Sequence, residues 1–159
     1  MQDRKVYTQK QALEQLRKFC VYRERSQSEV IEKLHKMGFY GDEADNILIQ
    51  LIDEDFLNEQ RFAEAFVSGK YKMKKWGRKL IVQKLKAKQV TEYCIRHAMK
   101  EIDEQEYLHN LKYLVEKKWK SLKGEHHLKR KEKTMRFAYN KGYETNLIIQ
   151  AIEEVKSAS

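Results

Sequence analysis

The chain has 159 residues, of which 41% are hydrophobic and 36% are charged. This length accommodates one ordinary domain or several small modules. Proline is absent and glycine occurs only six times, which argues against a turn-rich β-sandwich or barrel. The 33 Lys and Arg residues outnumber 24 Asp and Glu residues, and the net charge of +9 favours a polyanionic or acidic partner.

Targeting and disulfide signals are missing from the sequence. The first eight residues contain no apolar signal-peptide core, and no apolar run approaches the ~20 residues of a membrane span. Two cysteines, Cys20 and Cys94, are too few for a disulfide framework, and each lies on an apolar helical stripe. We therefore expect a soluble cytoplasmic protein with no membrane partner, in which both cysteines are buried as small hydrophobic residues.

Three segments of the chain share one apolar pattern. They are anchored at Leu34, Leu85 and Ala138, which are 51 and 53 residues apart. A helical pattern precedes each of these segments, at residues 10–22, 58–73 and 103–122. The sequence therefore predicts an all-α protein of nine helices in three triplets. We expect the divisions to fall at residues 1–56 (an N-terminal tail and the first repeat), 57–102 (the second) and 103–159 (the third).

Capping residues support these helices. Ser26 and Glu29 form an S-x-x-E pattern that predicts a capping box, and Gly38 and Gly142 stand where a helix end needs positive φ. Side chains suited to N-caps occur at Asn58, Thr91 and Thr145. A single triplet is small for an independent core, so we expect neighbouring repeats to share apolar surface.

A basic stretch follows an acidic one. Residues 42–64 contain eight acidic residues and one basic residue, whereas residues 65–91 contain no acidic residue. On a helix starting near Gly77, Ile81 and Leu85 would face inward while Lys79 and Lys86 point outward. The stretch indicates contact with phosphates or an acidic protein face, although a solvated helix face remains the alternative. Its candidate partner-binding residues are Lys70, Lys72, Lys74, Lys75, Arg78, Lys79 and Lys86.

Aromatic and arginine residues add two further candidates. Tyr71, Trp76 and Trp119 lie among lysines, so they either stack on exposed bases or pack the joint between two helices. Arg23 and Arg25 could bind carboxylates of an acidic partner, or could instead pair with nearby glutamates in a solvated turn.

Patterns for metal binding and catalysis are incomplete. His126-His127 and the pair Cys94 and His97 belong to no four-ligand zinc set, and the acidic turn at 53–55 lacks calcium-loop spacing. No phosphate-binding glycine loop or nucleophile–base pattern occurs in the sequence. We therefore expect a protein without a cofactor, a metal or an enzymatic activity.

Two parts of the chain resemble a known family. The run at residues 23–38 resembles the first repeat of the RecX family, regulators of the RecA recombinase. The runs at 51–67 and 74–90, with their Asn58-x-x-Arg61-Phe62-Ala63 element and a basic aromatic linker, resemble the second repeat. The chain departs from many relatives at Arg78, where they carry proline, and at Gln89, where they carry glycine.

The resemblance implies an elongated, curved array of three tandem three-helix repeats without enzymatic activity. It implies a monomer that binds the RecA filament, and single-stranded DNA through the filament or directly. Such binding limits filament extension, ATPase and strand exchange in DNA repair, recombination and the SOS response. Two alternatives stay open: a helical module that binds DNA independently of RecA, and a helical scaffold with no effect on DNA.

Overall fold

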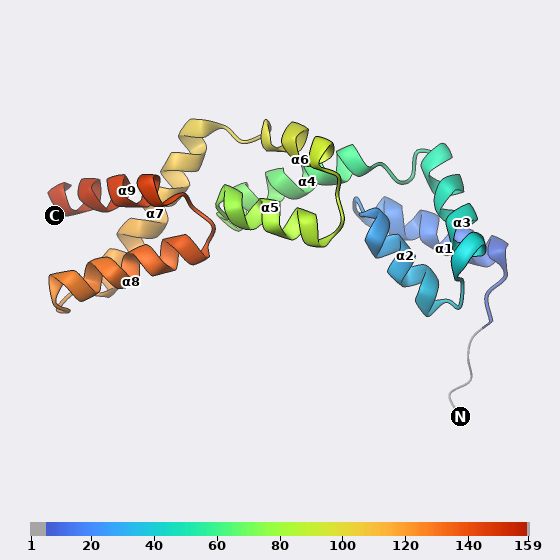
Figure 1. The fold of residues 1–159 in the computed structure, drawn as a ribbon, viewed down its shortest axis with the longest axis horizontal. Helices are drawn as coiled ribbons and strands as arrows, with labels where there is room; N and C mark the ends of the chain where they lie inside the picture. The colour runs from blue at the N-terminus through green and yellow to red at the C-terminus, as the bar shows by residue number, and fades with distance from the viewer. Residues whose placement is uncertain (1–5, 159) are drawn as a thin grey trace, which may run out of the picture.

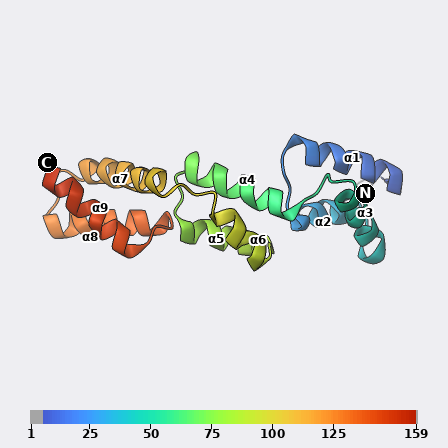
Figure 2. The ribbon, with the colours of Figure 1, turned by 90° about the horizontal axis from the view of Figure 1, so that it is seen from above.

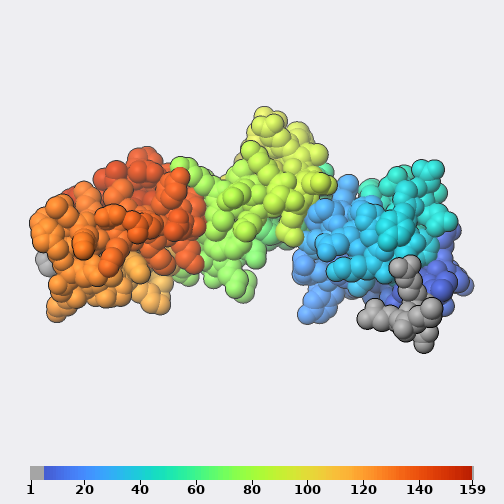
Figure 3. Space-filling model, turned by 60° about the horizontal axis from the view of Figure 1, so that its bottom comes forward, coloured from blue at the N-terminus to red at the C-terminus, as the bar shows by residue number. Residues whose placement is uncertain are grey.

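The computed structural model describes residues 6–158, and this part of the chain is all-α, as the sequence predicts. Its nine helices are α1 (Gln9–Tyr22), α2 (Gln27–Lys36), α3 (Gly41–Asp53), α4 (Glu59–Lys72), α5 (Arg78–Ala87), α6 (Glu92–Met99), α7 (Glu104–Ser121), α8 (His127–Asn140) and α9 (Thr145–Ala158). They follow one another in groups of three along the longest axis of the molecule, as Figures 1 and 2 show. The surface is notched where one repeat meets the next (Figure 3).

Each repeat closes a core of its own. The three clusters of buried residues are drawn from residues 12–57, 62–98 and 107–155. Among the partly buried residues, Ile102 packs against both the second and the third cluster. The expectation that neighbouring repeats share apolar surface is therefore largely wrong, because each triplet already buries its own large side chains. We propose the repeat divisions at 56/57 and 102/103 on this basis, although Leu57 packs in the first core.

Anchor residues of the repeat are buried as predicted. Leu34, Leu85 and Ala138 have exposed fractions of 0%. On α5, Ile81 is buried as well, while Lys79 and Lys86 lie on the outer side. Both cysteines are buried, and burial raises the pKa of the Cys20 thiol.

Two of the predicted N-caps are confirmed and one is wrong. Asn58 accepts a hydrogen bond from the third residue of α4, and Thr91 does the same for α6. Thr145 is instead the first residue of α9. The capping box at Ser26 is only half formed, because the Ser26 hydroxyl accepts from the Glu29 amide at 3.1 Å while the Glu29 carboxylate binds cations elsewhere.

The left-handed turn after each second helix occurs in all three repeats. Gly38 and Gly142 have φ values of 93° and 99°, as predicted, and Gln89 occupies the equivalent position with φ 62°. A residue with a side chain is strained in this conformation. The strain at Gln89 is the consequence of placing a side chain where the other two repeats carry glycine.

None of the helices among residues 6–158 is both long and apolar enough to cross a membrane.

Candidate interaction surfaces and the joints between repeats

The joint between the second and third repeats is a close contact of two backbones. A Cβ atom added to Gly77 would lie 2.2 Å from the carbonyl carbon of Gly142, and one added to Gly142 would lie 2.5 Å from the Cβ of Leu80. Both distances are far below van der Waals contact. The two glycines are therefore required by the approach of the repeats, and Gly77 has an ordinary extended φ of −81°.

The third repeat caps helix α5. The first amides of a helix have no partner within the helix, and Gly77 has no side chain to supply one. The amides of Gly77 and Lys79 instead donate to the carbonyl oxygens of Lys141 and Gly142, at 2.7 and 3.0 Å. The Arg78 amide donates to the hydroxyl oxygen of Tyr107 at 3.0 Å. The start of α5 thus depends on the next repeat.

Side chains complete this second joint. Arg78 binds Glu104 and Glu144, and its guanidinium lies 4.0 Å from the centre of the Tyr107 ring. The Tyr107 hydroxyl donates to Glu144. Burial, together with this hydrogen bond, raises the pKa of Tyr107 above its ordinary value. Arg78, which we predict to contact a partner, is thus engaged within the chain.

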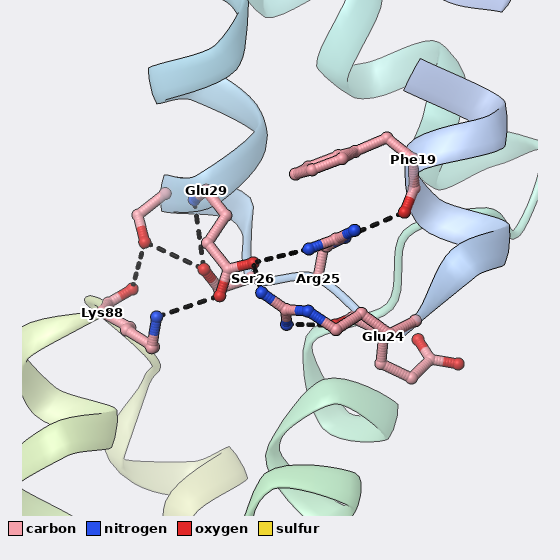
Figure 4. A network of polar contacts seen from close by, with 8 residues as sticks. Phe19, Glu24, Arg25, Ser26, Glu29 and Lys88 are labelled. Atoms are coloured by element: carbon pink, nitrogen blue, oxygen red, sulfur yellow. Dashed lines mark hydrogen bonds and ion pairs between the residues drawn. The ribbon is translucent and has the colours of Figure 1, made fainter. Parts of the chain in front are cut away.

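The joint between the first and second repeats is built from ion pairs instead. Its centre is Glu29, whose side chain is 13% exposed and lies 3.0 Å from Lys88 and 3.2 Å from Arg23 (Figure 4). The Ser28 hydroxyl donates to the Lys88 carbonyl oxygen at 2.9 Å. This joint is therefore held by side chains that reach across, whereas the second joint is held by backbone groups.

Arg61 forms the other half of the first joint. Its guanidinium binds Glu24 at 2.6 Å and Asp55 at 3.1 Å, and it also donates to the Asp55 carbonyl oxygen. Asn58 caps the helix that carries Arg61. The Asn58-x-x-Arg61-Phe62-Ala63 element, which carries the resemblance to the second RecX repeat, thus joins the first and second repeats through Arg61.

Arg25 is a packing residue in this structure. Only 7% of it is exposed, its guanidinium lies 3.6 Å from the centre of the Phe19 ring, and its Nε donates to the Phe19 carbonyl oxygen at 2.8 Å (Figure 4). Desolvation lowers the pKa of Arg25. Arg23 is more accessible, with a side chain that is 53% exposed. Both arginines pair with Glu29, which confirms the predicted pairing with a nearby glutamate, but the predicted solvated turn is wrong for the buried Arg25.

A groove lies between the first and second repeats. It has a volume of about 540 Å³, and its floor consists of apolar or small residues of α4 and the following turn. Its basic lining residues are Lys70, Lys74, Arg23 and Lys88, of which the last two pair with Glu29 at the first joint. The floor residues are Phe62, Ala65, Phe66, Gly69 and Met73.

A second basic surface lies on α5, away from the groove. It is a shallow depression lined by Arg78, Lys79, Val82, Gln83 and Lys86. Within residues 6–158, neither Lys79 nor Lys86 forms an ion pair, and both are exposed. The structure therefore divides the predicted basic residues into two groups on different surfaces.

Two of the predicted basic residues belong to neither group. Lys72 is exposed on α4 and lies 5.7 Å from the Tyr71 ring centre. Lys75 has its ammonium 5.5 Å from the Tyr113 ring centre, and its carbonyl oxygen accepts from the Tyr143 hydroxyl.

The aromatic residues of the basic stretches are used for packing. Tyr71 is 1% exposed and Trp119 is 5% exposed, so neither can stack on a base. Trp76 packs partly buried against the second core. The guanidinium of Arg130 lies 4.0 Å from the Trp119 ring centre and donates to the Trp119 carbonyl oxygen. This pair repeats in the third repeat the contact that Arg25 and Phe19 make in the first.

Metal-like clusters are absent from the described residues. Among residues 6–158, no three His, Cys, Asp or Glu side chains are arranged to hold a metal ion.

Family profiles match two of the three repeats. The profile described as RecX, second three-helix domain, matches residues 58–99, and that of the third three-helix domain matches residues 104–152. The chain belongs to the RecX family. Together the matches cover more than half of the chain, and they fall on the second and third repeats of the structure.

Curated relatives agree with this membership. The chain is 28% identical to a regulatory protein RecX of Oceanobacillus iheyensis over 86% of its own length and 50% of the relative's. It is 29% identical to one of Chlorobium phaeobacteroides, covering 84% of this chain and 85% of the relative. The chain spans about half the length of the first of these relatives. Both of these relatives carry the name regulatory protein RecX.

Solved structures share the fold. The crystal structure of RecX from Lactobacillus salivarius superposes with a TM-score of 0.81 at 21% identity, over 93% of this chain and 96% of that one. A second RecX crystal structure gives a TM-score of 0.82 at 19% identity, over 92% of this chain and 71% of that one. At these identities the likeness establishes the array of three-helix repeats.

Sequence patterns did not reveal the joint residues Arg61 and Lys88 or the packing residue Arg130. One signal was present for Arg61, because it is the only basic residue among eight acidic ones in residues 42–64. A lone cation in such a stretch is a candidate for ion pairing. Lys88 and Arg130 carry no comparable signal, because both lie in stretches rich in basic residues.

Proposed function

We propose that this protein binds the RecA filament on single-stranded DNA and limits its extension, ATPase and strand exchange. Membership of the RecX family is the observation that carries the proposal. A monomer in the cytoplasm, acting without a cofactor, is part of the same proposal.

The outer face of α5 supplies the contact with DNA in this proposal. Lys79 and Lys86 lie seven residues apart on one side of the helix, so their ammonium groups follow the same stripe. Lysines that neutralise phosphates release bound counterions and make affinity dependent on salt. These contacts carry no base-sequence information, so binding should be indifferent to sequence.

The elongated shape suits a regulator that spans several subunits of a filament. Three repeats in a row present surfaces along the length of the molecule (Figure 1). A protein lying across adjacent subunits would compete with their addition or rearrangement. Loss of ATPase follows indirectly, because turnover depends on the assembled filament.

The decisive experiment is a titration of this protein into RecA hydrolysing ATP on single-stranded DNA. We expect strong inhibition well below one molecule per RecA. The double variant Lys79→Glu/Lys86→Glu should inhibit less, and its binding should depend less on salt, with a log–log slope flatter by about 0.7 for each phosphate that is no longer neutralised. Lys10→Glu/Lys18→Glu is the matched control, because these two lysines are exposed on α1 and lie outside both basic surfaces.

An independent DNA-binding module is the alternative function. Two basic surfaces on a helical array are compatible with it. It predicts tight binding to bare DNA together with no inhibition of RecA. That pair of results would overturn the proposal and leave family membership as a guide to the fold.

A further inference from the structure

We infer that the groove between the first and second repeats is a docking site for an acidic, amphipathic peptide segment of a partner protein. The inference rests on the proposed function and deepens it, since the sequence pattern left Lys70 and Lys74 to contact either phosphates or an acidic protein face. It assigns these two lysines to protein, and it leaves Lys79 and Lys86 to DNA.

An exposed apolar side chain in the groove is the first observation. Met73 is 83% exposed, and it lines a hollow of about 540 Å³ together with Phe66 and Ala65. Methionine is flexible and polarizable, and it is used at surfaces that accept varied apolar side chains. The groove can therefore bind a leucine, methionine or phenylalanine side chain of a partner.

Unpaired cations beside that floor are the second observation. Lys70 on α4 and Lys74 in the bend after it both line the groove, and within residues 6–158 neither forms an ion pair. The Lys70 ammonium lies 5.3 Å from the Phe66 ring centre and 4.9 Å from the Trp76 ring centre. These rings position the charge without neutralising it, because a cation–π contact leaves the ammonium free to bind an anion.

Carboxylates among the lining residues favour a peptide over a nucleic acid. Glu24 and Glu29 line the groove, where the Glu24 carboxylate binds Arg61 and the Glu29 carboxylate binds Arg23 and Lys88. A phosphodiester backbone brings only acceptors and negative charge toward these oxygens. A peptide brings backbone N–H donors along with its own acidic side chains, so it can bind both the carboxylates and the lysines of the lining.

Occupancy of the groove would also act on the first joint. Arg23 and Lys88 line the groove while they pair with Glu29, so carboxylates of the occupant would compete with Glu29 for them. Because the walls come from two repeats, an occupant bridges them. Docking is therefore expected to fix the angle between the first and second repeats.

Methionine methyl NMR of the full chain tests the inference directly. The probe is a short fluorescein-labelled peptide of Glu, Leu and Ala, and its titration should shift the Met73 methyl resonance saturably. Met135 in the third repeat should not move. The Met73 signal is assigned with Met73→Leu, and fluorescence polarisation gives the affinity.

Groove variants supply the contrast. Lys70→Glu/Lys74→Glu should weaken binding of the peptide at least about tenfold, by removing two attractions and adding two repulsions. Met73→Glu should weaken it as well, and this position is exposed enough to keep the fold intact. Lys72→Glu is the matched control, because Lys72 is exposed on the same helix but does not line the groove; we expect less than about a threefold change.

Three results would overturn the inference. One is the absence of any Met73 shift with the peptide. Another is equal binding of a peptide whose leucines are replaced by serine, which would mean that the groove recognises only the charge of the peptide. The third is a stronger Met73 shift with oligothymidylate than with the peptide, which assigns the groove to nucleic acid. RecA inhibition is measured separately: peptide binding without inhibition supports the groove while defeating the proposed function, and inhibition without peptide binding does the reverse.

Discussion

Gly77→Ala tests whether the close contact of two backbones joins the second and third repeats. The Gly77 backbone has φ −81° and ψ 164°, which alanine adopts freely. Without the contact, alanine would stabilise the protein by about 0.4–1 kcal/mol by reducing the entropy of the unfolded chain. With the contact, the new methyl group meets Gly142 at 2.2 Å and the repeats must separate.

The magnitude follows from what separation breaks. Two backbone hydrogen bonds cross the joint, from Gly77 and Lys79, and a third bond joins the Tyr143 hydroxyl to the Lys75 carbonyl. At about 1 kcal/mol each, their loss outweighs the entropy gain, so we expect a net destabilisation of roughly 2 kcal/mol. The sign of the change thus decides whether the contact exists.

Gly69→Ala is the matched control for this change. Gly69 lies within α4, and a Cβ added there meets nothing within 4 Å. Alanine in a helix interior is more stable than glycine by about 0.5–1 kcal/mol, so this variant should be stabilised. The same substitution in one chain is therefore expected to have opposite signs at two positions.

Urea unfolding followed by circular dichroism measures both variants, and hydrogen exchange locates the effect. The Lys79 amide, which donates to Gly142, should lose protection in Gly77→Ala, while amides in the middle of α5 keep theirs. A stabilised Gly77→Ala variant with a protected Lys79 amide would falsify the described joint.

Three further predictions concern other residues. Gln89→Gly should stabilise the protein by about 0.5–1 kcal/mol in urea unfolding, because φ 62° strains glutamine; a destabilised variant contradicts this account. Burial raises the pKa of Tyr107 and of Tyr143, so on raising the pH the unfolded state loses these protons before the folded state does. The free energy of unfolding should therefore be unaffected by these groups below about pH 10 and fall above it. Tyrosinate absorbance should then show both tyrosines ionising only with unfolding, and ionisation in the folded protein refutes the assignment. Arg61→Ala should cost about 1 kcal/mol at low salt and less at high salt, as read from melting temperatures; a salt-independent loss would count against the ion pairs with Glu24.

Local patterns account for most of the fold. The spacing of Leu34, Leu85 and Ala138 revealed the repeat because a helix face must recur to bury each core. The cap at Asn58 was readable because capping bonds span only three residues. Thr145 shows that residue type alone does not fix the position of a cap. It is a threonine like Thr91, but it is the first residue of α9 and not its N-cap.

Candidate sites were predictable in composition but not in arrangement. Lys70 and Lys79 belong to one basic stretch, yet the structure places them on different surfaces. The bond from Arg61 to Glu24 spans 37 residues, and that from Lys88 to Glu29 spans 59. Such pairings depend on the angle between repeats, which no spacing within a helix encodes.

The two joints bring equivalent elements together but are held by different interactions. In each, the start of the second helix of one repeat meets the turn after the second helix of the next. At the second joint the Lys79 amide itself reaches Gly142, so the backbones touch and glycine is required. At the first joint the hydroxyl of Ser28 spans the gap to Lys88.

That gap explains how Gln89 can replace glycine. Because a side chain bridges the first joint, the backbones stay apart and position 89 loses its steric requirement, leaving only the strain of its positive φ. Ion pairs at this joint are weakened by salt, whereas the backbone bonds of the second joint are not. Bending of the array should therefore concentrate between the first and second repeats, where the groove and its unpaired lysines lie.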